Sequence, residues 1–285
     1  MKKLFSAVLI GFCAILTAKA EVNFAYEAGA EVVSSYLWRG QYNGGLSFQP
    51  YASVGYEGEK TSFSFGAWGS VGASDWQLIG KQDGYQAYFL PELDLSLSFT
   101  FFNVTIGATH YYYFGGSRFF CWDKLANWDD DAVENNSSTT ELQIGYNLAD
   151  FLPENQNAYI NWYTMIAGND FVYGDDDAVE KRAYSSYLEI GYDYTFDNIG
   201  LTLGAQIGMV PWASDYYGTE SFAVKNLSLK INKAWEFDAC ELDLFAQGMI
   251  DTHQLSKENA FIKANTGEKL YGQKLNGCIG LGIWF

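Results

Sequence analysis

The chain has 285 residues, of which 34 are acidic and 17 basic, giving a formal net charge of −17 at neutral pH. This charge argues against a nucleic-acid partner, because phosphate binding requires the opposite sign. Charged residues make up only 18% of the chain and Phe, Trp and Tyr together another 18%. So many aromatic residues are unusual in a water-soluble β-protein and typical of a membrane barrel, which places them in girdles at both interfaces.

Residues 1–20 have the pattern of a secretory signal peptide. Two lysines precede an apolar run over residues 4–16, and Ala18 and Ala20 supply the small side chains that precede a cleavage point. We therefore expect a signal peptide at 1–20 and a single mature domain over residues 21–285.

Beyond this segment, apolar and polar residues alternate in about twelve stretches separated by turn signals, which is the pattern of β-strands with one apolar face. In the second stretch, for example, Leu46, Phe48 and Val54 fall on one face and Ser47 and Gln49 on the other. The predicted strands cover residues 26–38, 46–57, 61–73, 86–99, 102–114, 138–148, 157–168, 183–196, 199–211, 222–234, 239–250 and 276–285.

Short and long connections alternate between these strands. The short ones lie at 58–60, 100–101, 197–198 and 236–238, and the long ones at 74–85, 115–137, 211–221 and 251–274. Outer-membrane barrels have this asymmetry, with short periplasmic turns and long extracellular loops. In lipid, every backbone N–H and C=O must be paired within the protein, so a spanning sheet has to close. The sequence therefore predicts an all-β fold, a closed antiparallel transmembrane β-barrel of about twelve strands in the cell outer membrane, with both ends of the mature chain in the periplasm.

The last predicted strand ends the sequence on an aromatic residue. Ile279, Leu281, Ile283 and Phe285 share one face of it, and glycines lie between them. A final strand ending in Phe resembles the signal that the outer-membrane barrel assembly machinery reads. The expected partners are therefore that machinery, through Phe285, and the lipid and lipopolysaccharide of the outer membrane.

Three short elements near the start of the mature chain carry a family resemblance. They are the segment Ser-Ser-Tyr-Leu-Trp-Arg-Gly at 34–40, the pair Gln49-Pro50, and Gly-Ala-Trp-Gly-Ser at 66–70. In this order they resemble the opening of the TorF-like porins and related outer-membrane families. The resemblance covers about the first fifty mature residues and implies a barrel with a transport role. It places Arg39 at the extracellular end of the first strand.

The residues that alternate with the lipid-facing set are expected to line the lumen. A Lys or Arg facing lipid at mid-bilayer costs about 2–4 kcal/mol, and an acid somewhat less, so charged strand residues belong inside. The predicted lumen-lining residues are Glu31, Arg39, Glu92, Asp94, Glu141, Glu189, Asp193, Lys230, Glu241 and Asp243. Because acids outnumber bases in this set, and acidic pores attract cations, the sequence predicts a porin-like channel for passive diffusion of small polar or cationic solutes.

A second interpretation stays open at this stage. The same acids would pair with tyrosines, Arg39 and Lys230 in a plugged lumen, and the barrel would be a structural or adhesion protein. Its long loops are rich in aromatic residues that could bind a partner, namely Phe119, Trp122, Trp128 and Tyr173.

An enzyme is not expected. Outer-membrane lipases carry a His-x-Ser pair on one strand, where base and nucleophile share a face. Neither His110 nor His253 has a serine at the second following position. His110 is expected instead in an aromatic girdle beside Tyr112 and Phe114.

No cofactor or metal site is expected either. The acidic run at 129–134 recurs at 175–180 in a second predicted loop, but neither run has the glycine-punctuated spacing of a calcium loop, so solvated acidic loops are the favoured interpretation. The mature chain keeps Cys121, Cys240 and Cys278, an odd number that defines no disulfide framework.

Overall fold

A computed structural model describes residues 23–72, 91–114, 119, 138–173, 179–214, 216–252 and 275–285. The predicted signal peptide, the acidic run at 129–134 and most of its repeat lie outside the described residues. Outside them too are Cys121, Trp122, Trp128 and His253, together with residues 86–90 of the predicted fourth strand.

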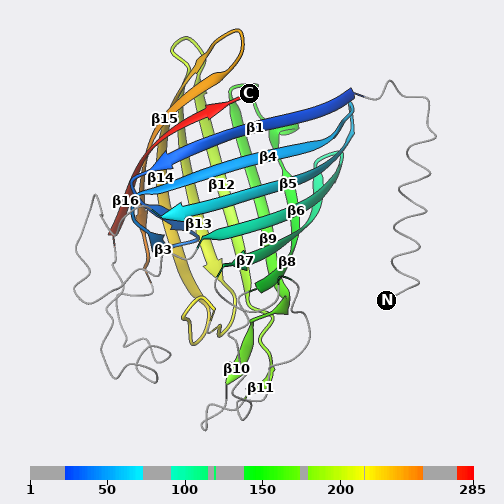
Figure 1. Cartoon of the computed structure of the whole chain (residues 1–285), viewed down its shortest axis with the longest axis vertical. Coiled ribbons are helices and arrows are strands. Elements are labelled where there is room, and N and C mark those ends of the chain that lie inside the picture. The colour runs from blue at the N-terminus through cyan, green and yellow to red at the C-terminus, as the bar shows by residue number, and fades with distance from the viewer. Residues whose placement is uncertain are drawn as a thin grey trace, which may run out of the picture.

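Twelve antiparallel strands close a barrel in the order β1-β16-β15-β14-β13-β12-β9-β8-β7-β6-β5-β4 (Figure 1). The barrel strands are β1 Asn23–Val33, β4 Ser47–Glu57, β5 Thr61–Gly72, β6 Glu92–Phe101, β7 Val104–Tyr113, β8 Ser138–Asn147, β9 Gln156–Gly168, β12 Ser186–Phe196, β13 Leu201–Val210, β14 Ala223–Glu236, β15 Glu241–Ile250 and β16 Leu275–Trp284. The other elements are β2 Tyr36–Trp38, β3 Gln41–Gly44, β10 Phe171–Tyr173, β11 Val179–Arg182 and the 3-10 turn η1 Ala149–Phe151. The predicted fold class and strand number are confirmed.

No helix in the described part of the chain is long and apolar enough to cross a membrane.

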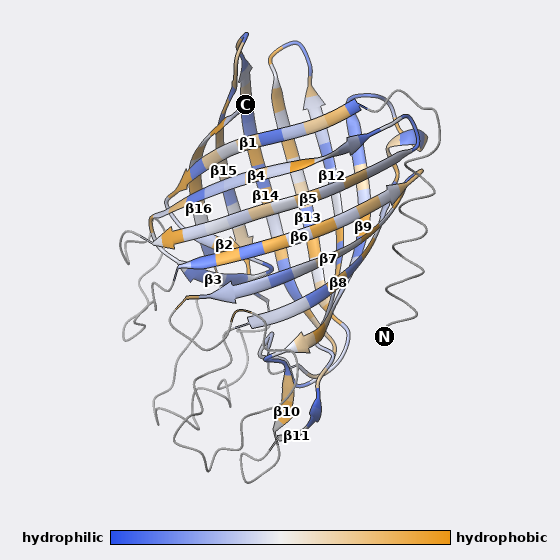
Figure 2. Ribbon diagram, turned by 45° about the vertical axis from the view of Figure 1, so that its right-hand side comes forward, coloured by the Kyte–Doolittle hydropathy of each residue, from blue (hydrophilic) through white to orange (hydrophobic). Residues whose placement is uncertain are grey.

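The outer face of the barrel is apolar. Val54, Phe65, Ile106, Ile144 and Leu229 are exposed there, one on each of five strands. Within each strand, the residues that alternate with the exposed ones point inward. Figure 2 shows hydrophobic residues recurring along the strands. A soluble protein does not leave an apolar surface of this extent open to water, whereas a closed barrel with such a surface satisfies its backbone in lipid. The barrel is therefore an outer-membrane protein.

Exposed aromatic side chains gather at both ends of the strands. At the end with the short turns they are Phe101, Phe102, Phe151, Phe196, Trp235, Phe237 and Phe285, and at the other end Phe48, Phe114, Tyr184, Trp212 and Phe222. Two such belts are the girdles that mark the membrane interfaces of outer-membrane barrels.

The strands are connected by short turns at one end of the barrel and by long loops at the other. We call these the short-turn end and the long-loop end. At the short-turn end, uppermost in Figure 1, the turns between paired strands are brief, as between β4 and β5, β6 and β7, or β14 and β15. The β10–β11 hairpin extends from the long-loop end. The alternation of connection lengths that was predicted from the sequence is thus observed.

Two predicted strands are too long. The first was expected over 26–38, but β1 ends at Val33, and Tyr36–Trp38 pairs with β3 in a separate two-stranded sheet. The eighth was expected from residue 183, but β12 begins at Ser186, because Tyr184 has a φ of 51° that breaks the extended conformation. In both places the alternation of side chains continued past the point where the backbone leaves the barrel wall.

Candidate functional site

A hairpin folds from the wall into the lumen near the long-loop end. It consists of residues 34–46, which connect β1 to β4 and contain β2 and β3; we call it the inner hairpin. Val33 and Ser47 are direct partners in the β1–β4 ladder, so the inner hairpin is an insertion between two strands that already pair without it.

The inner hairpin crosses the lumen. Leu37 packs on a cluster of Val33, Phe245 and Cys278, which belong to β1, β15 and β16. The next residue, Trp38, packs on a second cluster that is built around β12, β13 and the 211–222 loop. In the closed strand order β9 and β12 stand farthest from β1 and β4, so the hairpin reaches the wall opposite its own origin.

Arg39, at the tip of the inner hairpin, forms a buried ion pair with Glu141 of β8, and the two side chains are 8% and 3% exposed. Nη2 of Arg39 donates to Oε1 of Glu141 at 2.8 Å, and Nη1 donates to Oε2. Nη1 also donates to the hydroxyl of Tyr217 at 2.9 Å, and the Tyr111 hydroxyl donates to Glu141 Oε1 at 2.9 Å. The planar guanidinium suits this paired geometry in a way that a lysine ammonium would not.

Aromatic rings enclose the same guanidinium. Its carbon lies 3.8 Å from the ring centre of Tyr163, 4.6 Å from that of Trp38 and 5.1 Å from that of Tyr187. Each distance is within the range of a cation–π contact. We call Arg39, Glu141 and these rings, with Tyr111 and Tyr217, the Arg39 latch.

The loop at 211–222 closes over the latch from the long-loop end. Tyr217 of this loop is 2% exposed and stacks between Trp38 and Tyr187, with ring centres 6.0 and 5.5 Å away. The hydroxyl of Ser214 bonds that of Ser185 at 2.6 Å and accepts the Tyr217 amide at 3.2 Å. The loop therefore holds the ring that completes the latch.

Gly40 makes the turn of the inner hairpin. Its φ is +86°, and a Cβ built on it would lie 2.6 Å from the carbonyl oxygen of Lys225 in β14. Arg39 precedes it with a φ of 47°. A side chain at position 40 would thus meet both a disfavoured backbone conformation and an immovable neighbour, so the hairpin can seat against β14 only with glycine there.

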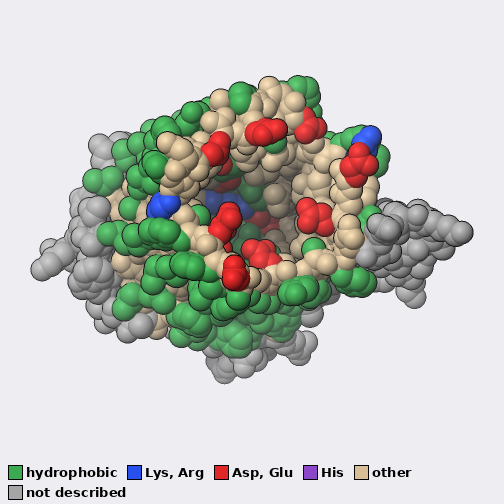
Figure 3. Space-filling model, turned by 90° about the horizontal axis from the view of Figure 1, so that it is seen from above, with side chains coloured by type: hydrophobic (Ala, Val, Ile, Leu, Met, Phe, Trp, Pro, Cys, Tyr) green, Lys and Arg blue, Asp and Glu red, His purple; other side chains and the backbone are tan. Residues whose placement is uncertain are grey.

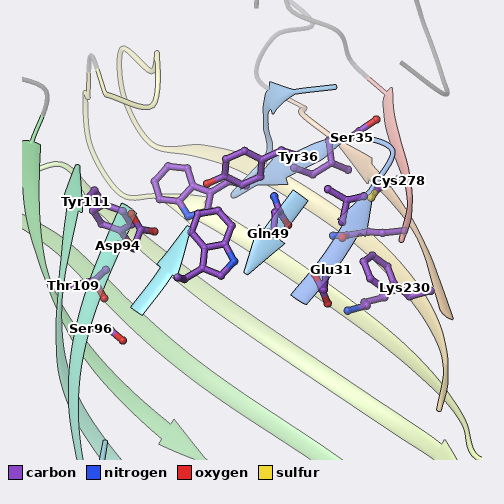
Figure 4. Close-up of a pocket in the computed structure, with 16 residues that line it drawn as sticks. Glu31, Ser35, Tyr36, Gln49, Asp94, Ser96, Thr109, Tyr111, Lys230 and Cys278 are labelled. Carbon is purple, nitrogen blue, oxygen red and sulfur yellow. The ribbon is translucent and has the colours of Figure 1, made fainter. Parts of the chain in front are cut away.

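A cavity of about 380 Å³ lies between the inner hairpin and the barrel wall; we call it the inner cavity (Figure 4). It extends from the hairpin toward the short-turn end, since Ser96 and Thr109 in the middle of β6 and β7 line it. Its charged lining residues are Glu31, Asp94 and Lys230.

The short-turn end is hollowed and acidic. Figure 3, viewed from above Figure 1, shows an open lumen with acidic side chains around its mouth. A cavity of about 520 Å³ in this mouth is lined by four acids, Glu27, Glu236, Glu241 and Asp243, and by no basic residue among those described. The described lining of this cavity is therefore acidic.

The structure divides the ten predicted lumen residues into groups. Glu31, Asp94 and Lys230 meet at the inner cavity, and Glu241 and Asp243 at the mouth. Arg39 was predicted at the end of the first strand, and this is wrong. It lies at the tip of the inner hairpin, where it pairs with Glu141.

The remaining three are held by polar neighbours. Glu92 faces Tyr36, Tyr113 and Asp94. Glu189 faces Tyr159, Asn161 and Gln206. Asp193 faces the charge of Lys230.

The sequence did not single out the aromatic half of the latch. Tyr111, Tyr163, Tyr187 and Tyr217 are not among the predicted lumen-lining residues, and Trp38 enters the sequence analysis only as part of a family motif. One signal was available for Tyr111 and Tyr187, because both fall in the inward phase of their strands, alongside Asp94 and Glu189 rather than with the lipid-facing set.

A second buried ion pair was also missed. Lys225 Nζ lies 2.6 Å from Asp251 Oδ2, and the side chains are 3% and 0% exposed. Lys225 is the extra residue of a bulge in β14, between Val224 and Asn226, which pair with consecutive residues of β13. A bulge reverses the in–out alternation locally, so the sequence pattern assigns this lysine to the wrong face.

Lys225→Met is expected to lower the free energy of unfolding by about 3–5 kcal/mol, because it leaves Asp251 buried without its counter-charge. The double variant Lys225→Met/Asp251→Asn removes both charges and should recover much of the loss. Urea unfolding of the barrel in lipid vesicles, followed by tryptophan fluorescence, measures both, with exposed Lys181→Met as the control. A single variant as stable as the wild type would show that the pair contributes nothing.

His110 is not arranged for catalysis. Its Nδ1 is 2.9 Å from the hydroxyl of Thr140 and its Nε2 is 2.6 Å from the Phe119 carbonyl oxygen. Its ring packs on that of Phe119, which also contacts Tyr112, so Phe119 lies against the barrel. In the described residues, no group of three or more His, Cys, Asp or Glu side chains is placed to hold a metal ion.

No protein-family model and no curated protein sequence matches the chain. Among solved structures, the NanC porin aligns with a TM-score of 0.47 and 7% identity over 92% of this chain and 99% of its own. The COG4313 outer membrane channel from Pseudomonas putida F1 aligns with a TM-score of 0.45 and 14% identity over 94% and 97%. OmpF of Salmonella typhi in complex with daunomycin aligns with a TM-score of 0.42 and 9% identity over 93% and 97%. The fold assigned above is based on strand pairing and on the outer face, not on these likenesses.

Proposed function

We propose that the protein is an outer-membrane channel for passive diffusion of small polar or cationic solutes, with its long-loop end outside the cell. The main support is the hollow, acid-lined lumen that opens at the short-turn end (Figure 3). A barrel of eight strands can be filled by its own side chains, whereas twelve strands enclose more space.

The charges of the lumen favour cations. Four acids line the mouth without a described basic partner, and the inner cavity adds two acids against one lysine. That lysine is itself engaged, since its Nζ lies 4.2 Å from the ring centre of Phe245 and its charge faces Glu31. Acidic linings concentrate cations and exclude anions.

The inner hairpin sets the size limit of the proposed channel. It crosses the lumen at the long-loop end and is held there by the Arg39 latch. Solutes would cross the lumen either beside the seated hairpin or after the hairpin has moved away. The proposed pore therefore admits small solutes and conducts weakly while the hairpin is latched. A permanently seated hairpin would instead plug the barrel, and conductance distinguishes the two.

Planar bilayers with a KCl gradient test the proposal. The wild type is expected to show discrete conductance steps and to prefer K⁺ over Cl⁻. Replacing two mouth acids, Glu241→Gln/Asp243→Asn, should lower that preference about two- to threefold, the effect of two charges roughly 8 Å from an ion in screened water.

The matched control is Asp150→Asn/Glu154→Gln, which removes the same charge from the turn between β8 and β9, outside the lining of the mouth. Its preference should equal that of the wild type. Absence of steps, or selectivity for Cl⁻, would refute the channel, and swelling of liposomes in a panel of sugars, amino acids and ammonium salts would define the solute range.

A further inference from the structure

The inner cavity has an aromatic cage around one carboxyl group. Trp68 of β5 and Tyr111 of β7 are the direct cross-strand neighbours of Asp94 in β6, one on each side. Such neighbours have Cβ atoms about 4.5–5.5 Å apart. All three residues line the inner cavity, and Figure 4 shows Asp94 beside Tyr111 on the wall.

The inner hairpin adds two more rings from the long-loop side. The Tyr36 ring centre is 5.4 Å from that of Trp68, and the Trp38 ring centre is 5.9 Å from that of Tyr111. Both hairpin residues line the inner cavity as well. We call Asp94 and these four rings the Asp94 cage.

Asp94 keeps acceptor capacity for a ligand. Asp94 lies beside Glu92, which shares its face of β6. Its Oδ1 is buried and has no hydrogen-bond partner among the described residues. A buried acceptor without a partner is costly unless a ligand or water satisfies it.

The Arg39 latch shows the same chemistry already occupied in the same lumen. There a cation of the chain itself lies against the rings of Tyr163, Trp38 and Tyr187 and pairs with Glu141. The Asp94 cage shares Trp38 and Tyr111 with the latch, but among the described residues no cation lies against its other two rings, Tyr36 and Trp68. Arg39 is committed to Glu141 and Lys230 lies over Phe245 on the opposite side.

We propose that the inner cavity binds a small organic cation of the quaternary ammonium type, with its charge between the rings of the Asp94 cage and Asp94. Aromatic rings around a carboxyl group are the arrangement that recognises such ligands. An anion would meet two acids and one engaged lysine, and an uncharged apolar ligand would offer no positive charge to the rings or to Asp94. The cavity of about 380 Å³ is within the size of small-ligand sites. This proposal deepens the proposed function by assigning a solute class to the channel, and it rests on that function.

Calorimetric titration of the purified barrel in detergent tests the proposal with choline chloride as the probe. Its neutral isostere, 3,3-dimethylbutan-1-ol, has the same shape without the charge. Choline is expected to bind at one site per barrel, and the alcohol at least about tenfold more weakly, as a desolvated cation–π and ion-pair site requires.

Two variants locate the site. Asp94→Asn should weaken choline binding about tenfold or more, and Trp68→Leu about five- to tenfold, because leucine keeps an apolar filling but has no π face. Asp150→Asn, which removes an acid from the turn between β8 and β9 rather than from the cage, should bind choline as the wild type does. Circular dichroism establishes that each variant is folded, and Trp68→Leu serves alone if Asp94→Asn does not fold.

The outcomes separate this proposal from the channel itself. Absence of choline binding, equal binding of the alcohol, or wild-type affinity in either cage variant would overturn the cation site, even if bilayers show conductance steps. Choline binding that depends on Asp94 in a barrel without conductance would retain the site and refute the channel.

Discussion

Replacing Arg39 with alanine is expected to raise the single-channel conductance of the barrel several-fold. The arginine holds the tip of the inner hairpin to the far wall through Glu141, Tyr217 and Tyr163. Without it, Glu141 is a buried charge without a counter-charge while the hairpin is seated, at a cost of about 3–5 kcal/mol. Release of the hairpin lets water reach Glu141, so the cost falls on the seated state alone. The equilibrium then shifts toward release by about two to four powers of ten.

Gly40→Ala tests the same latch without changing any charge. Its Cβ would meet the Lys225 carbonyl oxygen and occupy a φ that favours glycine, so the hairpin should again seat poorly and conductance should rise. Arg182→Ala is the control, because this arginine belongs to β11, where it lies over Phe171 and donates to the Gly168 carbonyl oxygen, and it makes none of the latch contacts. If both latch variants keep the conductance of the wild type, the hairpin does not limit the pore.

The barrel could be predicted from the sequence because its determinants are local. Lipid contact on one face and water or protein on the other impose a two-residue period on each strand. The segment at 201–204 is an example: Leu201 and Leu203 share one face, Thr202 and Gly204 share the other, and the segment forms β13 as expected. The lengths of the connections can also be read along the chain. The number of strands and the distinction between the short-turn end and the long-loop end could therefore be predicted.

The site could not be predicted in the same way because it depends on contacts between distant residues. Arg39 and Glu141 are 102 positions apart, and nothing in a single sequence says which acid a given arginine meets. The strand predicted over 26–38 includes the start of the inner hairpin, because Tyr36 to Trp38 continues the alternation of side chains. Arg39-Gly40 was taken for the end of that strand, although its backbone makes the turn of a second, inward hairpin.

Removing the inner hairpin altogether should give the largest conductance of any variant. Val33 and Ser47 are direct partners at the end of the β1–β4 ladder, so residues 34–46 can be replaced by Asn-Gly, which favours the two-residue turn that joins paired strands. All twelve barrel strands and their pairing are retained, and the barrel should therefore still close. The expected result in bilayers is a steady open level above that of Arg39→Ala, without the transitions that reseating of the hairpin would produce.

The matched deletion joins Phe171 to Arg182, which are also direct partners, through the same two residues and removes the tip of the β10–β11 hairpin. It should leave conductance unchanged, and an equal rise in both deletions would assign the effect to loop loss in general. The inner deletion has a second consequence, because it takes Tyr36 and Trp38 from the Asp94 cage. Choline affinity should then fall while conductance rises, a combination that simple widening of a pore without a binding site would not give.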